Sequence, residues 1–296
     1  MSRTSKRPAV LLNSPFLAQH VISAGLLTRQ QLRGPTWRRL LRGVYADAAI
    51  PVDHGLKIRA AELVIPPDAA LTGVSAAWLW GARLASPHDP VDVVRSPDRR
   101  LGLTGGLRVR TSPLPESDVE TRSGIRLTTP LRTAWELALR LHIVEAVAYC
   151  DGLAAQDRID PDSLARYLRE RTGEHGCRIA GRVFSLVDCR SESPQESRLR
   201  AWMALAGLPQ PVPQYEVRIA GEFVARLDFA WPEIKVAVEY DGVWHADAAQ
   251  LVRDRERLNR LQAAGWYVHH VTVRDMSDPR RTVAAIGQVL IRRSRS

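Results

Sequence analysis

Apolar residues recur along the chain either every three to four residues, as in helices, or every second residue, as in strands. Near the N-terminus this pattern predicts three short helices followed by a strand. The helices are expected over Ser14–Ala24, Thr28–Leu32 and Thr36–Arg42, and the strand over 43–46. This order of elements is that of a winged helix-turn-helix, which binds DNA. We assign it to residues 1–85.

The middle of the chain, residues 86–190, contains segments with the helix period and segments with the strand period, and no recognisable catalytic motif. Strands are expected over 91–95 and 107–110, and helices over 130–141, 144–155, 161–171 and 178–187. Its histidines have no metal-ligand spacing. The pattern therefore predicts an α/β connecting region, without catalytic or binding residues.

The last part of the chain, residues 191–296, is predicted to form an α/β domain. The elements are expected, in order, over 194–206 (helix), 212–219, 222–230 and 234–241 (strands), 248–264 (helix), 266–272 (strand) and 279–292 (helix). The order α-β-β-β-α-β-α is typical of an α/β sandwich around a mixed sheet. The fold class of the whole chain is α/β.

Composition agrees with a globular protein and limits its environment. Of the 296 residues, 45% are hydrophobic and 25% charged. No apolar run approaches the roughly 20 residues that cross a bilayer, and the N-terminus lacks the apolar stretch of a signal peptide. We therefore expect a cytoplasmic protein without a membrane partner. Its three cysteines, which are widely spaced, are expected to be reduced thiols.

The positive charge is concentrated at one end of the chain. The formal net charge is +10, and residues 1–50 hold eight Lys or Arg but only one acid, Asp47. Such a basic unit favours double-stranded DNA as a partner, although a role in solubility alone would give the same count. The residues predicted to contact DNA are Arg29, Arg33, Arg38, Arg39 and Arg42.

Three acids at strand spacing form the main candidate site. Glu239 and Asp241 lie on the same face of the predicted 234–241 strand, and Asp228 lies on the strand before it. Carboxylates that converge at the end of a buried strand repel one another unless a cation compensates them. The pattern therefore predicts a site for Mg²⁺ or Mn²⁺, which prefer oxygen ligands.

The spacing Asp228-x10-Glu239-x-Asp241, with Glu196 on the preceding helix, resembles the PD-(D/E)xK nuclease fold. The likeness is greatest to very-short-patch repair endonucleases, and it continues through 241–245 and 254–266. It covers roughly residues 190–275, which implies a restriction-endonuclease-like α/β sandwich. The chain departs from the pattern at Asp241, where a lysine is usual, and at Leu227, where a proline is usual.

The resemblance implies roles for the site residues. Asp228, Glu239 and the carbonyl of Tyr240 would hold the metal, and Asp241 or His245 would accept a proton. Arg257 would meet the phosphate. Simpler alternatives remain open for two residues, since Glu196 could only cap its helix and His245 could only pack beside Trp244.

A second resemblance lies near the N-terminus. The stretch LLRGVYAD, within 40–47, resembles the winged-helix domain of abortive-infection type IV antitoxins, over at most the first 85 residues. It implies a DNA-binding, autoregulatory arm and a cognate toxin protein as partner. Two functions thus remain open: a Mg²⁺-dependent DNA endonuclease that hydrolyses phosphodiesters, or an antitoxin and transcriptional repressor with a catalytically silent nuclease-like scaffold.

Overall fold

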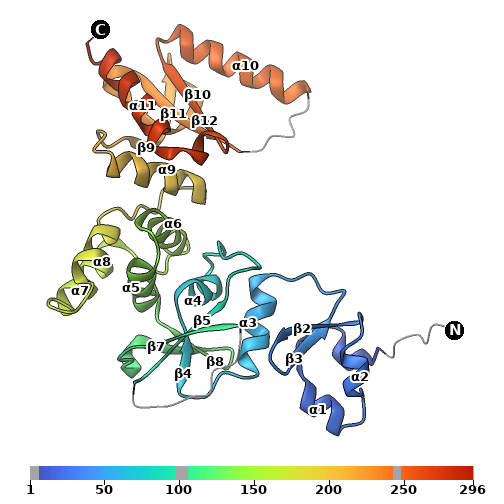
Figure 1. Cartoon of the computed structure of the whole chain (residues 1–296). Helices are drawn as coiled ribbons and strands as arrows, with labels where there is room; N and C mark the ends of the chain where they lie inside the picture. Colours follow the sequence, from blue (N-terminus) through green and yellow to red (C-terminus); the bar gives the residue numbers. More distant parts are fainter. Residues whose placement is uncertain (1–6, 98–105, 243–247, 296) are drawn as a thin grey trace. The chain divides into compact units, whose positions relative to one another are not determined.

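The computed structural model describes residues 7–97, 106–242 and 248–295, and the chain divides into two compact units, 1–140 and 141–296. The described residues form helices and three separate sheets, so the predicted α/β class is confirmed (Figure 1). No helix among these residues combines the length and the apolar character needed to cross a bilayer.

The N-terminal part of the first unit is a small three-stranded antiparallel sheet with two helices. Its sheet order is β1-β3-β2. The elements are η1 (Ala9–Leu11), β1 (Phe16–Leu17), α1 (Ala18–Ser23), α2 (Arg29–Leu32), β2 (Trp37–Leu41) and β3 (Val44–Asp47). Two short helices precede a β-hairpin, and β2 takes the place of the third helix that the predicted winged helix-turn-helix requires, so that assignment stays a prediction. Around Phe16 and Trp37, whose rings meet edge to face at 5.3 Å, lies an apolar core.

The predicted helix over Thr36–Arg42 is wrong, because these residues form strand β2. Trp37 and Leu41 are buried four residues apart, a spacing that fits one face of a helix. The spacing does not distinguish a helix from a strand, because a regular strand also places residues four apart on one face. Pairing with β3, with a register shift between Arg39 and Leu41, decides in favour of the strand. The predicted first helix is also shorter than expected, since β1 precedes it.

The rest of the first unit is a five-stranded sheet with order β6-β5-β4-β8-β7. Its strands are β4 (Ala69–Leu71), β5 (Val91–Arg95), β6 (Leu107–Thr111), β7 (Val119–Arg122) and β8 (Ile125–Thr128), with helices η2 (Glu116–Asp118), α3 (His54–Glu62), α4 (Gly73–Trp80) and α5 (Pro130–Arg140). Strand β4 pairs with both β5 and β8, so the boundary predicted at residue 85 falls inside this sheet. Strands β4, β7 and β8 are too short for periodicity to reveal them.

The second unit begins with three helices, α6 (Ile143–Ala154), α7 (Pro161–Glu170) and α8 (Cys177–Phe184). A four-stranded sheet with order β12-β11-β10-β9 follows. Its elements are α9 (Pro194–Leu205), β9 (Val212–Ile219), β10 (Glu222–Trp231), η3 (Pro232–Ile234), β11 (Val236–Asp241), α10 (Ala248–Ala263), β12 (Tyr267–Thr272), η4 (Asp275–Ser277) and α11 (Pro279–Arg293).

This order of helices and strands confirms the prediction for residues 191–296. Strands β11 and β12 are parallel and the other pairs antiparallel, which makes the sheet mixed. One face packs against α9 and α11 and the other against α10, as the alternation in β11 predicts (Figure 1). The strand begins at Val236, two residues later than expected, because Lys235 adopts a left-handed conformation with φ of 49°.

Candidate functional site

The register between β10 and β11 brings two of the predicted acids together. Phe229 pairs with Val238, so Asp228 and Glu239 are the next residues to face each other across the two strands. The backbone N–H of Tyr240 donates a hydrogen bond of 2.8 Å to Oδ2 of Asp228. The convergence expected from the sequence is therefore present at this end of the sheet.

The environment of Asp228 disfavours its charged form. Burial raises the pKa of this carboxyl to about 6, and the carboxylates of Glu196, Glu239 and Asp241 act in the same direction. The hydrogen bond from Tyr240 opposes this rise but does not cancel it. We call these four residues, Glu196, Asp228, Glu239 and Asp241, the acid cluster.

Glu196 lies buried near the start of α9, and only part of its environment is that of a helix cap. The side chain of Ser193 accepts a hydrogen bond from the Glu196 N–H, as a cap requires. In a capping box, the Glu196 carboxylate would accept a hydrogen bond from the Ser193 N–H. Its Oε2 instead accepts hydrogen bonds of 3.0 Å from the Glu192 N–H and from Nε2 of Gln214. Ser193 caps the helix, and the Glu196 carboxylate is directed to strand β9.

Gln214 is a cluster residue that the sequence did not reveal. It lies opposite Asp228 in the β9–β10 register and has a left-handed φ of 52°, unusual for a strand residue. Its amide binds Glu196, so strand β9 connects two acids of the cluster. A single glutamine in an alternating strand gives no local signal of this role.

Glu239 is held by Arg257 of α10. Two hydrogen bonds, 2.7 Å from Nη1 to Oε1 and 3.0 Å from Nη2 to Oε2, join the guanidinium to the buried carboxylate. This bond to Glu239 raises the pKa of Arg257 above its usual value. The predicted contact of Arg257 with a phosphate stays a prediction. In this structure both Nη atoms of its guanidinium are bonded to Glu239.

Asp241 has a basic partner that the sequence did not identify. Nδ1 of His270, on β12, lies 3.0 Å from Oδ2 of Asp241 and 3.9 Å from Oε2 of Glu239. The parallel register, in which Glu239 pairs with His270, creates this proximity. His245, the histidine predicted for the site, lies outside the described residues. The Nζ of Lys235, just before β11, donates to the Ala264 carbonyl.

The donor types of the acid cluster suit a hard cation, but their arrangement here does not fit one. Both Glu239 oxygens are bonded to Arg257, and one oxygen each of Asp228 and Asp241 is already engaged. Among the described residues, no group of three or more His, Cys, Asp and Glu is placed to hold a metal ion. A cation would first have to displace Arg257 from Glu239.

The arginines predicted to contact DNA lie on α2 and the β2–β3 hairpin, and all five are exposed. Two of them also bond to the backbone: Nη1 of Arg38 donates to the Ile50 carbonyl at 3.2 Å, and Nε of Arg39 to the Leu41 carbonyl at 3.3 Å. These bonds hold the two side chains close to the hairpin. The exposed set is Arg29, Arg33, Arg38, Arg39 and Arg42.

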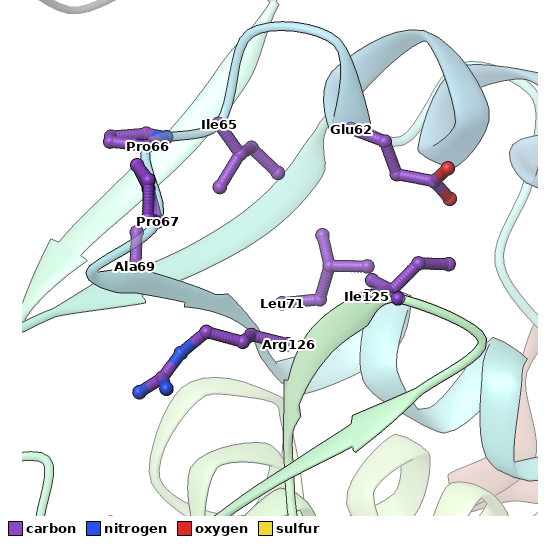
Figure 2. A pocket seen from close by; sticks show the side chains of 9 residues that line it. Glu62, Ile65, Pro66, Pro67, Ala69, Leu71, Ile125 and Arg126 are labelled. Carbon is purple, nitrogen blue, oxygen red and sulfur yellow. The ribbon is translucent and has the colours of Figure 1, made fainter.

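A cavity of about 210 Å³ opens beside the five-stranded sheet of the first unit. Figure 2 shows Leu71 and Ile125 in its middle, with Glu62 and Arg126 on opposite sides. Burial raises the pKa of Glu62 above its usual value. Guanidinium Nη2 of Arg126 is 3.0 Å from the exposed carboxylate of Glu116. The cavity is lined mostly by apolar side chains and prolines.

Comparison with known proteins finds a family match in the middle of the chain. Residues 69–186 match the AbiEi antitoxin C-terminal domain. This match includes all five strands of the five-stranded sheet and helices α4 to α8. The predicted antitoxin resemblance is therefore supported, but over a different segment: it was expected within the first 85 residues, and the connecting region of the prediction is the part that matches.

Two curated relatives come from Mycobacterium tuberculosis. Uncharacterized protein MT2308 of strain CDC 1551 / Oshkosh and Uncharacterized protein Rv2248 of strain ATCC 25618 / H37Rv are each 34% identical over 200 residues. The alignment covers 64% of this chain and 73% of each relative. The chain belongs to their family.

One solved structure was also matched. The RV2827C protein from Mycobacterium tuberculosis matches with a TM-score of 0.41 and 18% identity, over 70% of this chain and 84% of that chain. The comparisons support the antitoxin resemblance, and they give no support to the predicted likeness to very-short-patch repair endonucleases.

Proposed function

We propose that this protein is an antitoxin-type transcription regulator that binds double-stranded DNA through its N-terminal hairpin and acts with a cognate toxin. The match of residues 69–186 to the AbiEi antitoxin C-terminal domain carries the proposal. The same compact unit contains the β2–β3 hairpin with its exposed arginines, which support the proposed DNA contact. A DNA-binding arm joined to an antitoxin domain is the composition expected of a regulator that represses its own promoter.

The DNA surface rests on the charge and exposure of the hairpin. Arg38, Arg39 and Arg42 are exposed, and the backbone bonds of the first two limit their motion. Guanidinium groups suit phosphate oxygens, and each neutralised phosphate releases counterions, so affinity falls as salt rises.

A binding assay tests the DNA surface. Replacing Arg38, Arg39 and Arg42 together by Ala should weaken binding to the protein's own promoter, measured by fluorescence anisotropy. The slope of log affinity against log salt should become shallower by about 0.9 for each lost contact. A matched variant that replaces the exposed Arg166, Arg169 and Arg182 of the second unit by Ala should retain the original slope. If the hairpin variant retains it too, DNA binds elsewhere.

The toxin partner is tested in cells. Expression of this chain should restore growth to cells that express the toxin encoded beside its gene. A truncated chain lacking residues 141–296 should show whether the first unit is sufficient. Failure of the full chain to restore growth, with DNA binding intact, would reduce the proposal to a transcription repressor.

Metal-dependent phosphodiester hydrolysis is a second candidate function, and one observation favours it. Four carboxylates converge at one strand end, and burial raises the pKa of Asp228 to about 6. Plasmid nicking in Mg²⁺ or Mn²⁺ by the native protein, but not by Asp228→Asn, is the result that this function requires. If the native protein binds its promoter but nicks no DNA in either ion, the cluster is a scaffold.

A further inference from the structure

Two arginines share one face of the edge strand β6. Arg108 and Arg110 are two residues apart, so their side chains leave the strand on the same side. In the parallel register with β5, Arg108 pairs with Asp92 and Arg110 with Val94. Because β6 is at the edge of the five-stranded sheet, a partner can reach this face from beside the strand.

The first of these arginines is neutralised within the fold. Arg108 binds the buried carboxylate of Asp92 through both Nε and Nη2, the latter at 2.8 Å. Asp92 also accepts the N–H of Val74 at the start of α4. Gly73 makes this approach possible, since a Cβ there would lie 2.7 Å from Asp92 Oδ2.

Helix α5 supplies further charges to the same region. Arg132 is buried and binds both Asp118 and Glu136 at 2.8 Å. Arg140, at the end of the helix, lies 3.5 Å from the other oxygen of Glu136. Every acid of this network is therefore already shared with at least one guanidinium.

Arg110 has no carboxylate partner among the described residues. It is half-buried, and within the described part of the chain it forms no hydrogen bond or ion pair. Burial lowers the pKa of Arg110, and the positive charges of Arg140 and Arg108 lower it further. The carboxylates of Asp92 and Glu136 act in the opposite direction, but each is ion-paired with another arginine. A guanidinium stays protonated at neutral pH, so this face keeps a positive charge without an ion pair of its own among the described residues.

We propose that Arg110, with the positive charges of Arg108 and Arg140 nearby, binds a phosphate group. A phosphate offers several acceptor oxygens and up to two negative charges, which suits a guanidinium beside two further guanidiniums. The partly exposed side chains of Arg108 and Arg140 leave room for it, since they are 39% and 36% accessible. The proposal does not depend on the antitoxin function.

The position of the strand suggests two sources for this phosphate. Gly106, two residues before Arg108, packs directly against Leu41 of the β2–β3 hairpin, where a Cβ would lie 2.5 Å from the leucine Cδ2. The phosphate site thus begins near the surface proposed to bind DNA. One source is therefore the backbone of duplex DNA, and the other is a free phosphorylated small molecule.

The test compares Arg110→Gln with Arg59→Gln, a variant with the same change in charge at an exposed site of α3. Isothermal titration with sodium tripolyphosphate should give saturable binding to the native protein and to Arg59→Gln. Binding to Arg110→Gln should be at least about tenfold weaker, because a charge-assisted bond is lost. Without ligand, the melting temperature of Arg110→Gln should be equal to or above the native value, since repulsion among the guanidiniums falls.

Two further measurements separate the sources. If the phosphate belongs to DNA, Arg110→Gln should lower the salt slope of duplex binding by about 0.9 while the hairpin arginines are intact. If it belongs to a small molecule, ATP should bind with an Arg110-dependent affinity and the salt slope should not change.

The proposal is overturned if Arg110→Gln and Arg59→Gln bind tripolyphosphate, ATP and duplex DNA equally. It is also overturned if only poly-glutamate distinguishes the two variants, because the surface would then recognise carboxylates. Loss of DNA binding in the hairpin variant alone leaves these outcomes unaffected, so the two proposals fail separately.

Discussion

The two units of this protein each contain a cluster of charged side chains. The first cluster has an excess of positive charge and the second an excess of negative charge. In the first unit, Asp92, Asp118 and Glu136 are paired with three guanidiniums, and a fourth, that of Arg110, has no ion pair among the described residues. In the acid cluster of the second unit, four carboxylates share Arg257 and His270. A phosphate would be attracted to the first cluster and repelled by the second.

The difference shows that the burial of charged side chains does not by itself indicate which ion a site binds. Both clusters contain side chains with shifted pKa, which is the usual sign of a functional site. Only the sign of the uncompensated charge distinguishes what each can bind. The first cluster needs an anion, whereas the second needs a proton on Asp228 or a cation that replaces Arg257.

The largest expected effect is at Arg132, where the first cluster is fully paired. Arg132→Met should leave Asp118 and Glu136 buried with weaker partners and lower the free energy of unfolding by about 3–5 kcal/mol. Urea denaturation measures the change. Arg126→Met is the control, since its partner Glu116 is 80% exposed and its loss should cost less than about 1 kcal/mol. Equal effects in both variants would show that the buried pairing contributes little.

The corresponding change in the second unit is Arg257→Met. It should lower the free energy of unfolding by about 2–3 kcal/mol, less than in the first unit because the side chain of Arg257 is 29% exposed. The variant also frees both oxygens of Glu239, so millimolar Mn²⁺ should raise its melting temperature more than that of the native protein. Arg260→Met on the same helix, whose partner Glu222 is exposed, should show neither effect. An Mn²⁺ response confined to the native protein would contradict this account.

A smaller and opposite effect is expected at Asp228. Its folded-state pKa of about 6 lies above the roughly 3.9 of an unfolded aspartate, so the native state binds the proton more tightly. That contribution is complete below about pH 4 and is lost as the pH rises through 6. Asp228→Asn should therefore increase the free energy of unfolding by about 1–2 kcal/mol at pH 8, and the difference should vanish near pH 4.

Thermal denaturation at several pH values measures this prediction. Asp162→Asn, at an exposed position of α7, is the matched control and should show no such dependence on pH. A native protein more stable than Asp228→Asn at pH 8 would mean that the hydrogen bond from Tyr240 outweighs the burial of the charge.

The sequence predicted the second unit better than the first for a physical reason. From α9 to α11, most helices and strands have six or more residues. Within each of them the apolar residues repeat at the period of that element, so the local pattern and the final fold agree. In the first unit, β4 has three residues, and the four-residue spacing of Trp37 and Leu41 in β2 is compatible with both a strand and a helix. Pairing with distant strands decides such segments, and a local pattern does not contain that information.

The same division holds for the sites. The sequence by itself determined that Asp228 and Glu239 would face each other across neighbouring strands, because the two-residue period of each strand fixes their faces. It also determined that the first 50 residues are basic, but not that Arg38 and Arg39 lie on a strand. The tertiary structure decided that Arg257 holds Glu239, that His270 reaches Asp241, that Gln214 binds Glu196 and that Arg110 lacks a partner among the described residues. Charge pairing depends on distances between strands and helices far apart in sequence, and only folding sets those distances.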